Sequence, residues 1–106
     1  MQPVNPKWQH SGLVLVCERC SKERIPEETP EVAARMGDFD LRSWLKSELK
    51  SSGDWGRLRV VSSSCLDVCA KGCITVCFEP ANGEPEVLVV DPIDDREALL
   101  RKIQSM

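Results

Sequence analysis

Four cysteines arranged as two close pairs are the residues of this chain best suited to chemistry. Cys17 and Cys20 are separated by two residues, and Cys65 and Cys69 are separated by three. Thiolate sulfur is a soft donor that binds iron and zinc well, and sites with four such donors are commonly built from two pairs. The spacing therefore predicts that these four sulfurs meet around one inorganic centre.

Cysteine usage agrees with a metal or redox role. Residues 1–12 have neither a basic start nor an apolar segment, and no apolar run approaches the roughly 20 residues that span a bilayer. We therefore expect a soluble, cytoplasmic protein with no membrane partner. Thiols stay reduced in the cytoplasm, so disulfide bonds are a poor explanation for the presence of six cysteines in this chain.

Length and composition predict one domain without a nucleic-acid surface. The 106 residues suffice for a single modest core, and we divide them into an N-terminal arm, residues 1–12, and a domain, residues 13–106. A net charge of −3 offers no basic surface for nucleic acid. The single histidine, His10, lies in the arm and no glycine-rich phosphate loop is present, so we do not expect an enzyme.

The apolar pattern places the first cysteine pair at the end of a strand. Leu13–Val16 is a continuous apolar run, typical of a strand covered on both faces. Residues 21–35 are rich in charge and contain two prolines, so we predict an exposed loop with one helical turn at residues 31–36. An amphipathic helix follows at residues 41–52, capped by Asp38 or Asp40 and ended by Gly53.

A second strand at residues 57–64 leads into the second cysteine pair. A strand, a crossover helix and a strand form a βαβ unit, whose two strands are parallel. Their carboxyl ends meet at one edge of the sheet, where parallel sheets bind ligands. Cys17 and Cys65 are therefore expected at the same edge.

The last third of the chain is predicted to form a hairpin and a helix. Strands at residues 74–78 and 87–90 flank Asn82-Gly83, a pair that favours the positive φ angles of a tight hairpin turn. A final helix, capped by Asp94, is patterned by Ile93, Ala98, Leu99, Leu100 and Ile103. The predicted class is α/β, a four-stranded mixed sheet with two helices in the order strand, helix, strand, strand, strand, helix.

The element order and one motif resemble a known family, the thioredoxin-like [2Fe-2S] ferredoxins, which are similar to the small iron–sulfur subunit of respiratory complex I. Residues 65–72, Cys-Leu-Asp-Val-Cys-Ala-Lys-Gly, resemble the family run Cys-Leu-x-x-Cys-x-x-Gly-Pro, which holds the third and fourth cluster ligands. The resemblance implies a thioredoxin-like fold with Cys65 and Cys69 as these two ligands. Cys17 resembles the family's first ligand.

The second ligand departs from the family pattern. The family places this cysteine ten or more residues past the first, or four residues on in the complex I relatives, whereas residues 27–30 contain none. Cys20 is then the candidate second ligand. Cys73 stands where the family has proline, so it is the alternative to Cys20.

The resemblance further implies a small electron carrier that binds one [2Fe-2S] cluster through Cys17, Cys20, Cys65 and Cys69. Its partners would be redox proteins. Three alternatives stay open: a structural zinc site made of four cysteines, a thiol–disulfide protein that uses Cys17 and Cys20, and a module without metal. We expect no helix to start at Cys20, and this counts against thiol–disulfide exchange, which relies on a helix N-terminus.

A homodimer is predicted from the apolar content of the strands. Residues 13–16 and 87–90 are apolar on both strand faces, yet only two helices are expected, both on one face of the sheet. The other face then needs a cover, either the arm carrying Val4 and Trp8 or a second copy of the chain. We expect the second copy, and homodimers are also what the family resemblance implies. Cys77 is expected to be a structural filler on the side of its strand that faces away from the helices.

Overall fold

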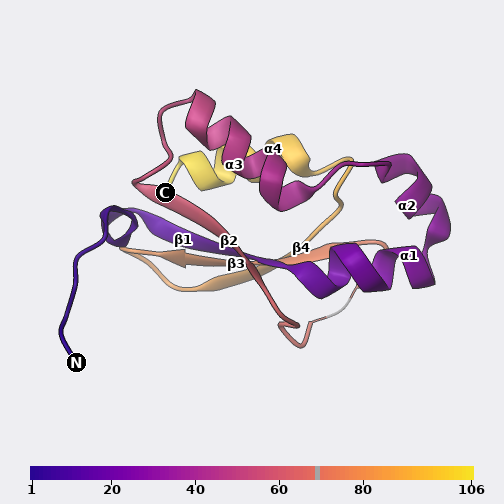
Figure 1. The fold of residues 1–106 in the computed structure, drawn as a ribbon, viewed down its shortest axis with the longest axis horizontal. Coiled ribbons are helices and arrows are strands. Elements are labelled where there is room, and N and C mark those ends of the chain that lie inside the picture. Colours follow the sequence, from indigo (N-terminus) through magenta and orange to yellow (C-terminus); the bar gives the residue numbers. More distant parts are fainter. Residues whose placement is uncertain (69) are drawn as a thin grey trace.

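The chain folds around a four-stranded mixed sheet, as the computed structural model shows for residues 1–68 and 70–106 (Figure 1). The strand order is β2-β1-β3-β4. The strands are β1 (Gly12–Cys17), β2 (Leu58–Ser63), β3 (Ile74–Pro80) and β4 (Glu86–Val90). The predicted α/β class and mixed sheet are confirmed. Within the described residues, no helix is long and apolar enough to cross a bilayer.

The pairing of β1 brings the two cysteine segments to one edge. β1 pairs with β2 in parallel, with Cys17 opposite Ser63, and with β3 in antiparallel orientation. β4 completes the sheet as the antiparallel partner of β3. The parallel pairing predicted for the βαβ unit is correct. Cys65 follows the carboxyl end of β2 by two residues, beside the end of β1.

Helix α3 (Leu41–Ser51) connects the parallel strands much as predicted. The Asp40 carboxylate accepts a hydrogen bond from the Ser43 main-chain N–H at 3.1 Å and so caps the first turn. Gly53 has φ +81°, a conformation that only glycine adopts at little cost, and it ends the helix. The apolar stripe that contains Leu45 and Leu49 is fully buried.

The predicted order with two helices is wrong, because most of residues 20–36 are helical rather than an exposed loop. These residues form a π-helical segment η2 (Cys20–Arg24), α1 (Ile25–Glu28) and α2 (Pro30–Met36). The helical turn predicted at residues 31–36 is confirmed by α2. Both prolines lie in the first turn of a short helix, where the missing N–H is not needed. The buried side chain of Ile25 anchors this segment in the core.

The hairpin between β3 and β4 also differs from the prediction. Neither Asn82 nor Gly83 has a positive φ angle, so the tight turn typical of Asn-Gly is not formed. The connection runs over residues 81–85, long enough to close without positive φ angles. Its first residue, Ala81, donates its main-chain N–H to the Ser11 carbonyl at 3.1 Å and ties the hairpin to the start of β1.

The final helix, α4 (Arg96–Gln104), starts one residue later than an Asp94 cap would place it, because its N-cap is Asp95. The carboxylate of Asp91 accepts main-chain N–H groups of Ile93 and Asp94 at 2.9 and 3.0 Å. These bonds hold residues 91–94 in a turn of their own, so helical geometry begins only after Asp95.

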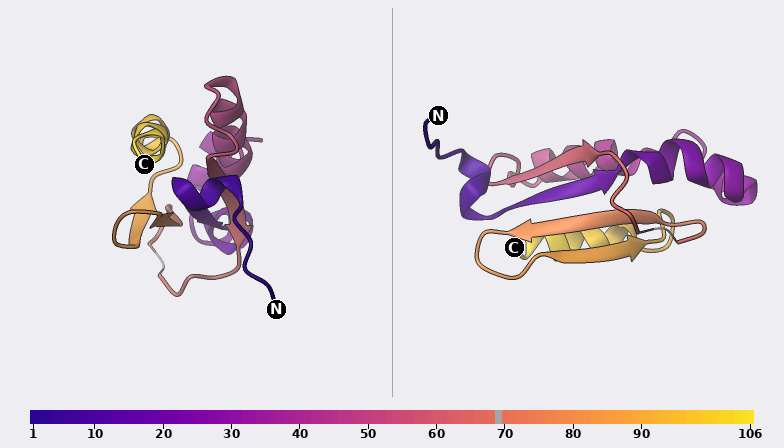
Figure 2. Two further views of the ribbon diagram at one scale, coloured as in Figure 1. Left: turned by 90° about the vertical axis from the view of Figure 1, so that its left-hand side faces the viewer. Right: turned by 90° about the horizontal axis from the view of Figure 1, so that it is seen from below.

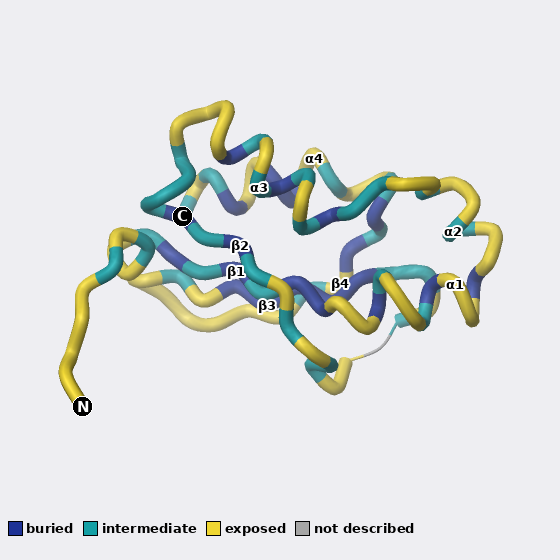
Figure 3. Tube along the Cα trace, in the orientation of Figure 1, coloured by how far each residue is buried: buried dark blue, intermediate teal, exposed yellow. Residues whose placement is uncertain are grey.

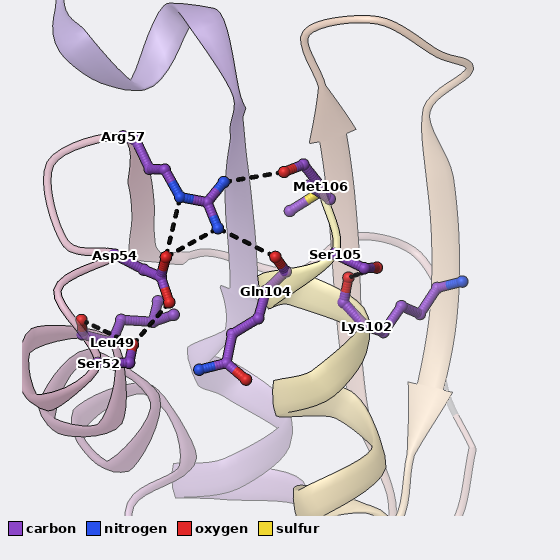
Figure 4. Close-up of polar contacts among 8 residues, drawn as sticks. All are labelled: Leu49, Ser52, Asp54, Arg57, Lys102, Gln104, Ser105 and Met106. Atoms are coloured by element: carbon purple, nitrogen blue, oxygen red, sulfur yellow. Dashed lines mark hydrogen bonds and ion pairs between the residues drawn. The ribbon is translucent and has the colours of Figure 1, made fainter.

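The Arg57 side chain fastens the end of α4 to the start of β2 (Figure 4). Its guanidinium donates to the main-chain oxygens of Gln104 and Met106 at 3.0 and 2.8 Å and to the Asp54 carboxylate at 2.9 Å. A cation beside the last carbonyls of a helix satisfies otherwise unpaired acceptors. These hydrogen bonds hold the C-terminal end of α4 at the end of the sheet opposite the cysteines.

Helices α3 and α4 cover the same face of the sheet (Figures 1 and 2). The buried side chains of this layer include Val14, Val16, Leu45, Leu49, Val60, Ile74, Val76, Phe78 and Ile103. On the other face, Val87 and Val89 of β4 are 49% and 42% exposed. Residues 1–6 run away from the sheet and are largely exposed, and a short 3₁₀ turn, η1 (Lys7–His10), joins them to β1 (Figure 3). They leave Val87 and Val89 on this second face uncovered, whereas Thr75 and Cys77 on the same face are buried.

Candidate metal centre

The first cysteine pair lies on a strand-to-helix turn. Cys17 is the last residue of β1, Glu18 and Arg19 are already helical, and Cys20 begins η2. Both cysteines are buried, each with 1% of its surface exposed. The expectation that no helix starts at this pair is therefore wrong, because the helical backbone begins directly after β1.

Main-chain N–H groups of both cysteine segments lie close enough to the Cys17 sulfur to favour its thiolate. One belongs to Cys20 and the other to Leu66, the residue after Cys65. Burial, together with the neighbouring Cys20 thiol, raises the pKa of Cys17 above its ordinary value. The contact with Leu66 shows that the two segments meet, as the parallel pairing of β1 and β2 predicts.

The sulfur of Cys20 has a more polar environment. Burial alone would raise the pKa of Cys20, but the Thr75 main-chain N–H, the Cys17 side chain and the charge of Arg24 together hold it below its ordinary value. The Cys20 thiol donates to Thr75 Oγ1 at 3.8 Å. Of the two cysteines in this pair, Cys20 is therefore the one whose thiolate form is more strongly stabilised.

The second cysteine segment carries one accessible thiol next to this pair. Cys65 is half-buried, and the main-chain N–H of Asp67 points at its sulfur at 3.4 Å. Asp67 has φ +59°, which is uncommon for a residue other than glycine and tightens this turn. The predicted ligand Cys69 lies outside the described residues.

Cys73, the alternative ligand, also lies near the first pair. It follows Gly72, which has φ +75°, and its thiol is close enough to Cys20 for the two to interact electrostatically. Burial, followed by the carboxylates of Asp91 and Asp95, raises the pKa of Cys73. Cys73 therefore lies on the same side of the molecule as the first pair, and it stays the alternative to Cys20.

Cys77 lies apart from this group, as predicted. It occupies the middle of β3, opposite Leu15 of β1 and Val87 of β4, and it is 8% exposed. Its thiol faces the Glu79 carboxylate at 3.7 Å. Burial, followed by the charge of Glu79, raises the pKa of Cys77, so it remains a protonated thiol within the sheet.

An open groove of about 520 Å³ leads to Cys65 from the surface. It is lined by Glu18, Arg19, Lys22, Glu23, Ser64 and Cys65. The four charged side chains come from the turn after β1 and form two ion pairs, Lys22 with Glu18 and Arg19 with Glu23. The groove is therefore polar but nearly neutral, and it exposes one thiol of the group.

The thiols and their N–H donors make a suitable donor set for iron or zinc. Main-chain N–H groups aimed at sulfur stabilise thiolates and tune the properties of a metal bound to them. Among residues 1–68 and 70–106, however, no three His, Cys, Asp or Glu side chains stand in a geometry that would hold a metal ion. Cys17, Cys20 and Cys65, three of the four predicted ligands, are all described and do not form such a group. The structure supplies Cys17 and Cys20 as a buried pair near the second segment, and Cys69 lies outside the described residues.

The family resemblance predicts main-chain N–H groups of residues 18–21 and 66–71 as donors to the cluster sulfurs, and the N–H groups of Cys20 and Leu66 beside Cys17 belong to these ranges. Thr75 was not predicted as part of the site. It is a single hydroxyl within the apolar run Ile74–Phe78, on the strand face opposite the core, and that isolated polar residue is a signal that could have pointed to it.

No family model, curated protein or solved structure matches this chain.

Proposed function

We propose that this protein is a small electron carrier that binds one [2Fe-2S] cluster through Cys17, Cys20, Cys65 and Cys69. The observation that carries the proposal is the meeting of two cysteine segments, far apart in sequence, at one end of β1 and β2. The Leu66 N–H beside the Cys17 sulfur marks that meeting. Paired thiolates from two segments match the ligand requirement of such a cluster.

The surroundings of the thiols fit electron transfer better than substrate chemistry. A bound cluster would supply one-electron redox chemistry. Cys17 and Cys20 are buried, so the protein shields their sulfurs from water, whereas Cys65 lines the groove. A partner docked at that groove would approach the centre from its exposed side. We accordingly propose redox proteins as the partners and no catalytic residues.

The fold supports a finer classification as thioredoxin-like. The sheet order β2-β1-β3-β4, with one parallel pair followed by an antiparallel hairpin and a helix, is the arrangement that the family resemblance implies. We propose this topology for the chain, together with a cytoplasmic location. A homodimer formed through the uncovered sheet face belongs to the same proposal.

Thiol–disulfide exchange through Cys17 and Cys20 is a second candidate, favoured by the helix that begins directly after β1. Such exchange needs an accessible, activated first thiol. Here both thiols are 1% exposed, and burial raises the pKa of the first one, Cys17. The geometry is therefore a poorer fit to exchange with another protein than to a buried metal ligand. Structural zinc bound by the same cysteines is the remaining alternative.

Metal and sulfide analysis of anaerobically purified protein separates these candidates. We expect iron and acid-labile sulfide in equal amounts, two of each per chain, as the cluster composition requires. Stoichiometric zinc without sulfide would replace the proposal with the structural zinc site. Protein free of iron and zinc whose Cys17 and Cys20 form a disulfide reversibly would favour the exchange function.

A further inference from the structure

Thr75 is a fully buried polar residue placed between the two cysteine segments. Its side chain is 0% exposed. Its hydroxyl donates to the Val68 carbonyl oxygen at 2.6 Å and accepts from the Cys20 thiol at 3.8 Å. One residue of β3 therefore holds the first segment at Cys20 and the second segment at Val68.

The hydrogen bonds between Thr75, Val68 and Cys20 must change when Cys20 binds a metal. A hydroxyl has a single proton, which Thr75 gives to Val68, and the bond to Cys20 depends on the thiol proton. A metal-bound sulfur has no proton and only accepts. The lone pairs of Thr75 Oγ1 would then face a negatively charged sulfur, and this contact becomes favourable only if the hydroxyl proton turns toward that sulfur.

Resting on the proposed function, we propose that Thr75 is a positioning residue that holds Cys20 for the cluster and donates its hydroxyl hydrogen bond to the ligated sulfur. A bond from a hydroxyl to a ligand sulfur stabilises the reduced, more electron-rich state more than the oxidised one, so it raises the reduction potential. When the hydroxyl proton turns toward Cys20, the bond from Thr75 to the Val68 carbonyl is lost, and Val68 is next in sequence to the proposed ligand Cys69. Metal binding at Cys20 would in this way change the hydrogen bonding of the second cysteine segment.

Two substitutions at Thr75 separate the hydroxyl from the shape of the side chain. Thr75→Val keeps the volume and branching of threonine without the hydroxyl, and Thr75→Ser keeps the hydroxyl alone. The reduction potential of each purified protein is measured by spectroscopic titration. We expect Thr75→Val to lower the equilibrium constant for reduction about tenfold, equivalent to about 59 mV for one electron. Thr75→Ser should stay close to the wild-type value.

A matched control is available at Thr29, the other buried threonine. Thr29 is 4% exposed and its hydroxyl donates to the Ile25 carbonyl at 3.1 Å rather than bonding any cysteine among the described residues. Thr29→Val should leave the potential unchanged. An equal shift in Thr29→Val and Thr75→Val would overturn the proposal, because it would reflect general loosening of the fold.

The remaining outcomes separate this inference from the proposed function. A colourless wild-type protein refutes the cluster itself, whereas a coloured wild type whose potential is unchanged in Thr75→Val refutes only the role of Thr75. A Thr75→Val protein that folds, as judged by circular dichroism, but loses the cluster while Thr75→Ser retains it supports the positioning role. If Thr75→Val does not fold, Thr75→Ser decides: a wild-type potential supports the hydroxyl as the donor, and a tenfold shift overturns it.

Discussion

Under the proposed function, Cys65 is the ligand that a partner protein would reach first, because it lines the groove while Leu66, the next residue, lies beside Cys17. Cys17 and Cys20, in contrast, have almost no exposed surface. At the scale of single residues, cysteines of similar chemistry therefore have different roles in the proposed function. Cys17 and Cys20 would bind the cluster away from water, and Cys65 would bind it on the side that faces the groove.

Replacing Cys65 or Cys69 by serine should abolish or severely weaken cluster assembly. Removal of one thiolate leaves an iron ion without its full ligand set and open to water. The measurement is iron and sulfide content, with circular dichroism to verify folding. Cys77→Ser is the matched control, because Cys77 contacts Glu79 rather than the group of thiols, and it should retain iron.

The choice between Cys20 and Cys73 is decided by the same assay. Both lie on the same side of the molecule, but the donors around Cys20 stabilise its thiolate, whereas burial and two carboxylates disfavour the Cys73 thiolate. We therefore expect Cys20→Ala to lose the cluster and Cys73→Ala to keep it. The reverse result would make Cys73 the ligand.

The cysteines could be identified from the sequence because residue type and spacing carry the information. Their meeting followed from one further inference, the parallel strands of a βαβ unit, and that pairing is correct. Main-chain donors were expected from residues 18–21 and 66–71, and the Leu66 N–H beside Cys17 is one of them. Thr75 was not foreseen, because a single hydroxyl in an apolar strand does not reveal which distant segments it will contact.

At the scale of elements, the helices at residues 20–36 mark the limit of sequence reasoning. Pro26 and Pro30 were read as loop residues, yet each occupies the first turn of a short helix, where proline is favoured. Such short helices lack the repeated apolar spacing that made α3 predictable. Their stability comes from tertiary contacts, such as the buried Ile25, which no local pattern reveals.

Gly53 and Gly83 should respond differently to substitution by alanine. Gly53 ends α3 with φ +81°, where an alanine side chain is strained, so Gly53→Ala should lower the free energy of unfolding by about 1 kcal/mol. Gly83 has no positive φ and should tolerate alanine with little change. Chemical denaturation measures both, and an equally large loss at Gly83 would contradict the loop geometry described for β3 and β4.

The Asp54–Arg57 pair predicts how stability depends on acid. The Ser52 hydroxyl and the Arg57 guanidinium hold the pKa of Asp54 below its ordinary value. The folded state thus binds this proton less readily than the unfolded state, so the stabilisation is complete above about pH 4 and is lost as pH falls through the lowered pKa. Asp54→Asn should remove this contribution.

The test compares the free energy of unfolding of wild type and Asp54→Asn between pH 7 and pH 2. We expect Asp54→Asn to be less stable by about 1 kcal/mol at pH 7, with the difference shrinking toward pH 2. Other acidic residues titrate in both proteins and cancel in the comparison. A difference that stays constant over the whole range would show that the charge of Asp54 does not contribute.

At the scale of the whole molecule, the uncovered sheet face predicts association of two chains. Both α3 and α4 lie on the opposite face, residues 1–6 run away from the sheet, and Val87 and Val89 are substantially exposed (Figures 1 and 3). We expect light scattering coupled to size-exclusion chromatography to give twice the 11.9 kDa chain mass.

A charge placed on this face provides the control. Val89→Lys should shift the protein to a monomer, whereas Val4→Lys, at an exposed site on the N-terminal arm, should leave the dimer intact. Wild-type protein that elutes as a single species of 11.9 kDa across the micromolar range would rule out the dimer.

The central claim is that these cysteines hold a [2Fe-2S] cluster that carries one electron, and a reductive titration of anaerobically purified protein tests it most directly. The account predicts a red-brown protein whose visible bands bleach partially as it takes up one electron per cluster. An electron paramagnetic resonance signal of a spin-½ centre should appear in step with that uptake. A colourless protein that contains stoichiometric zinc and takes up no electron would contradict the claim.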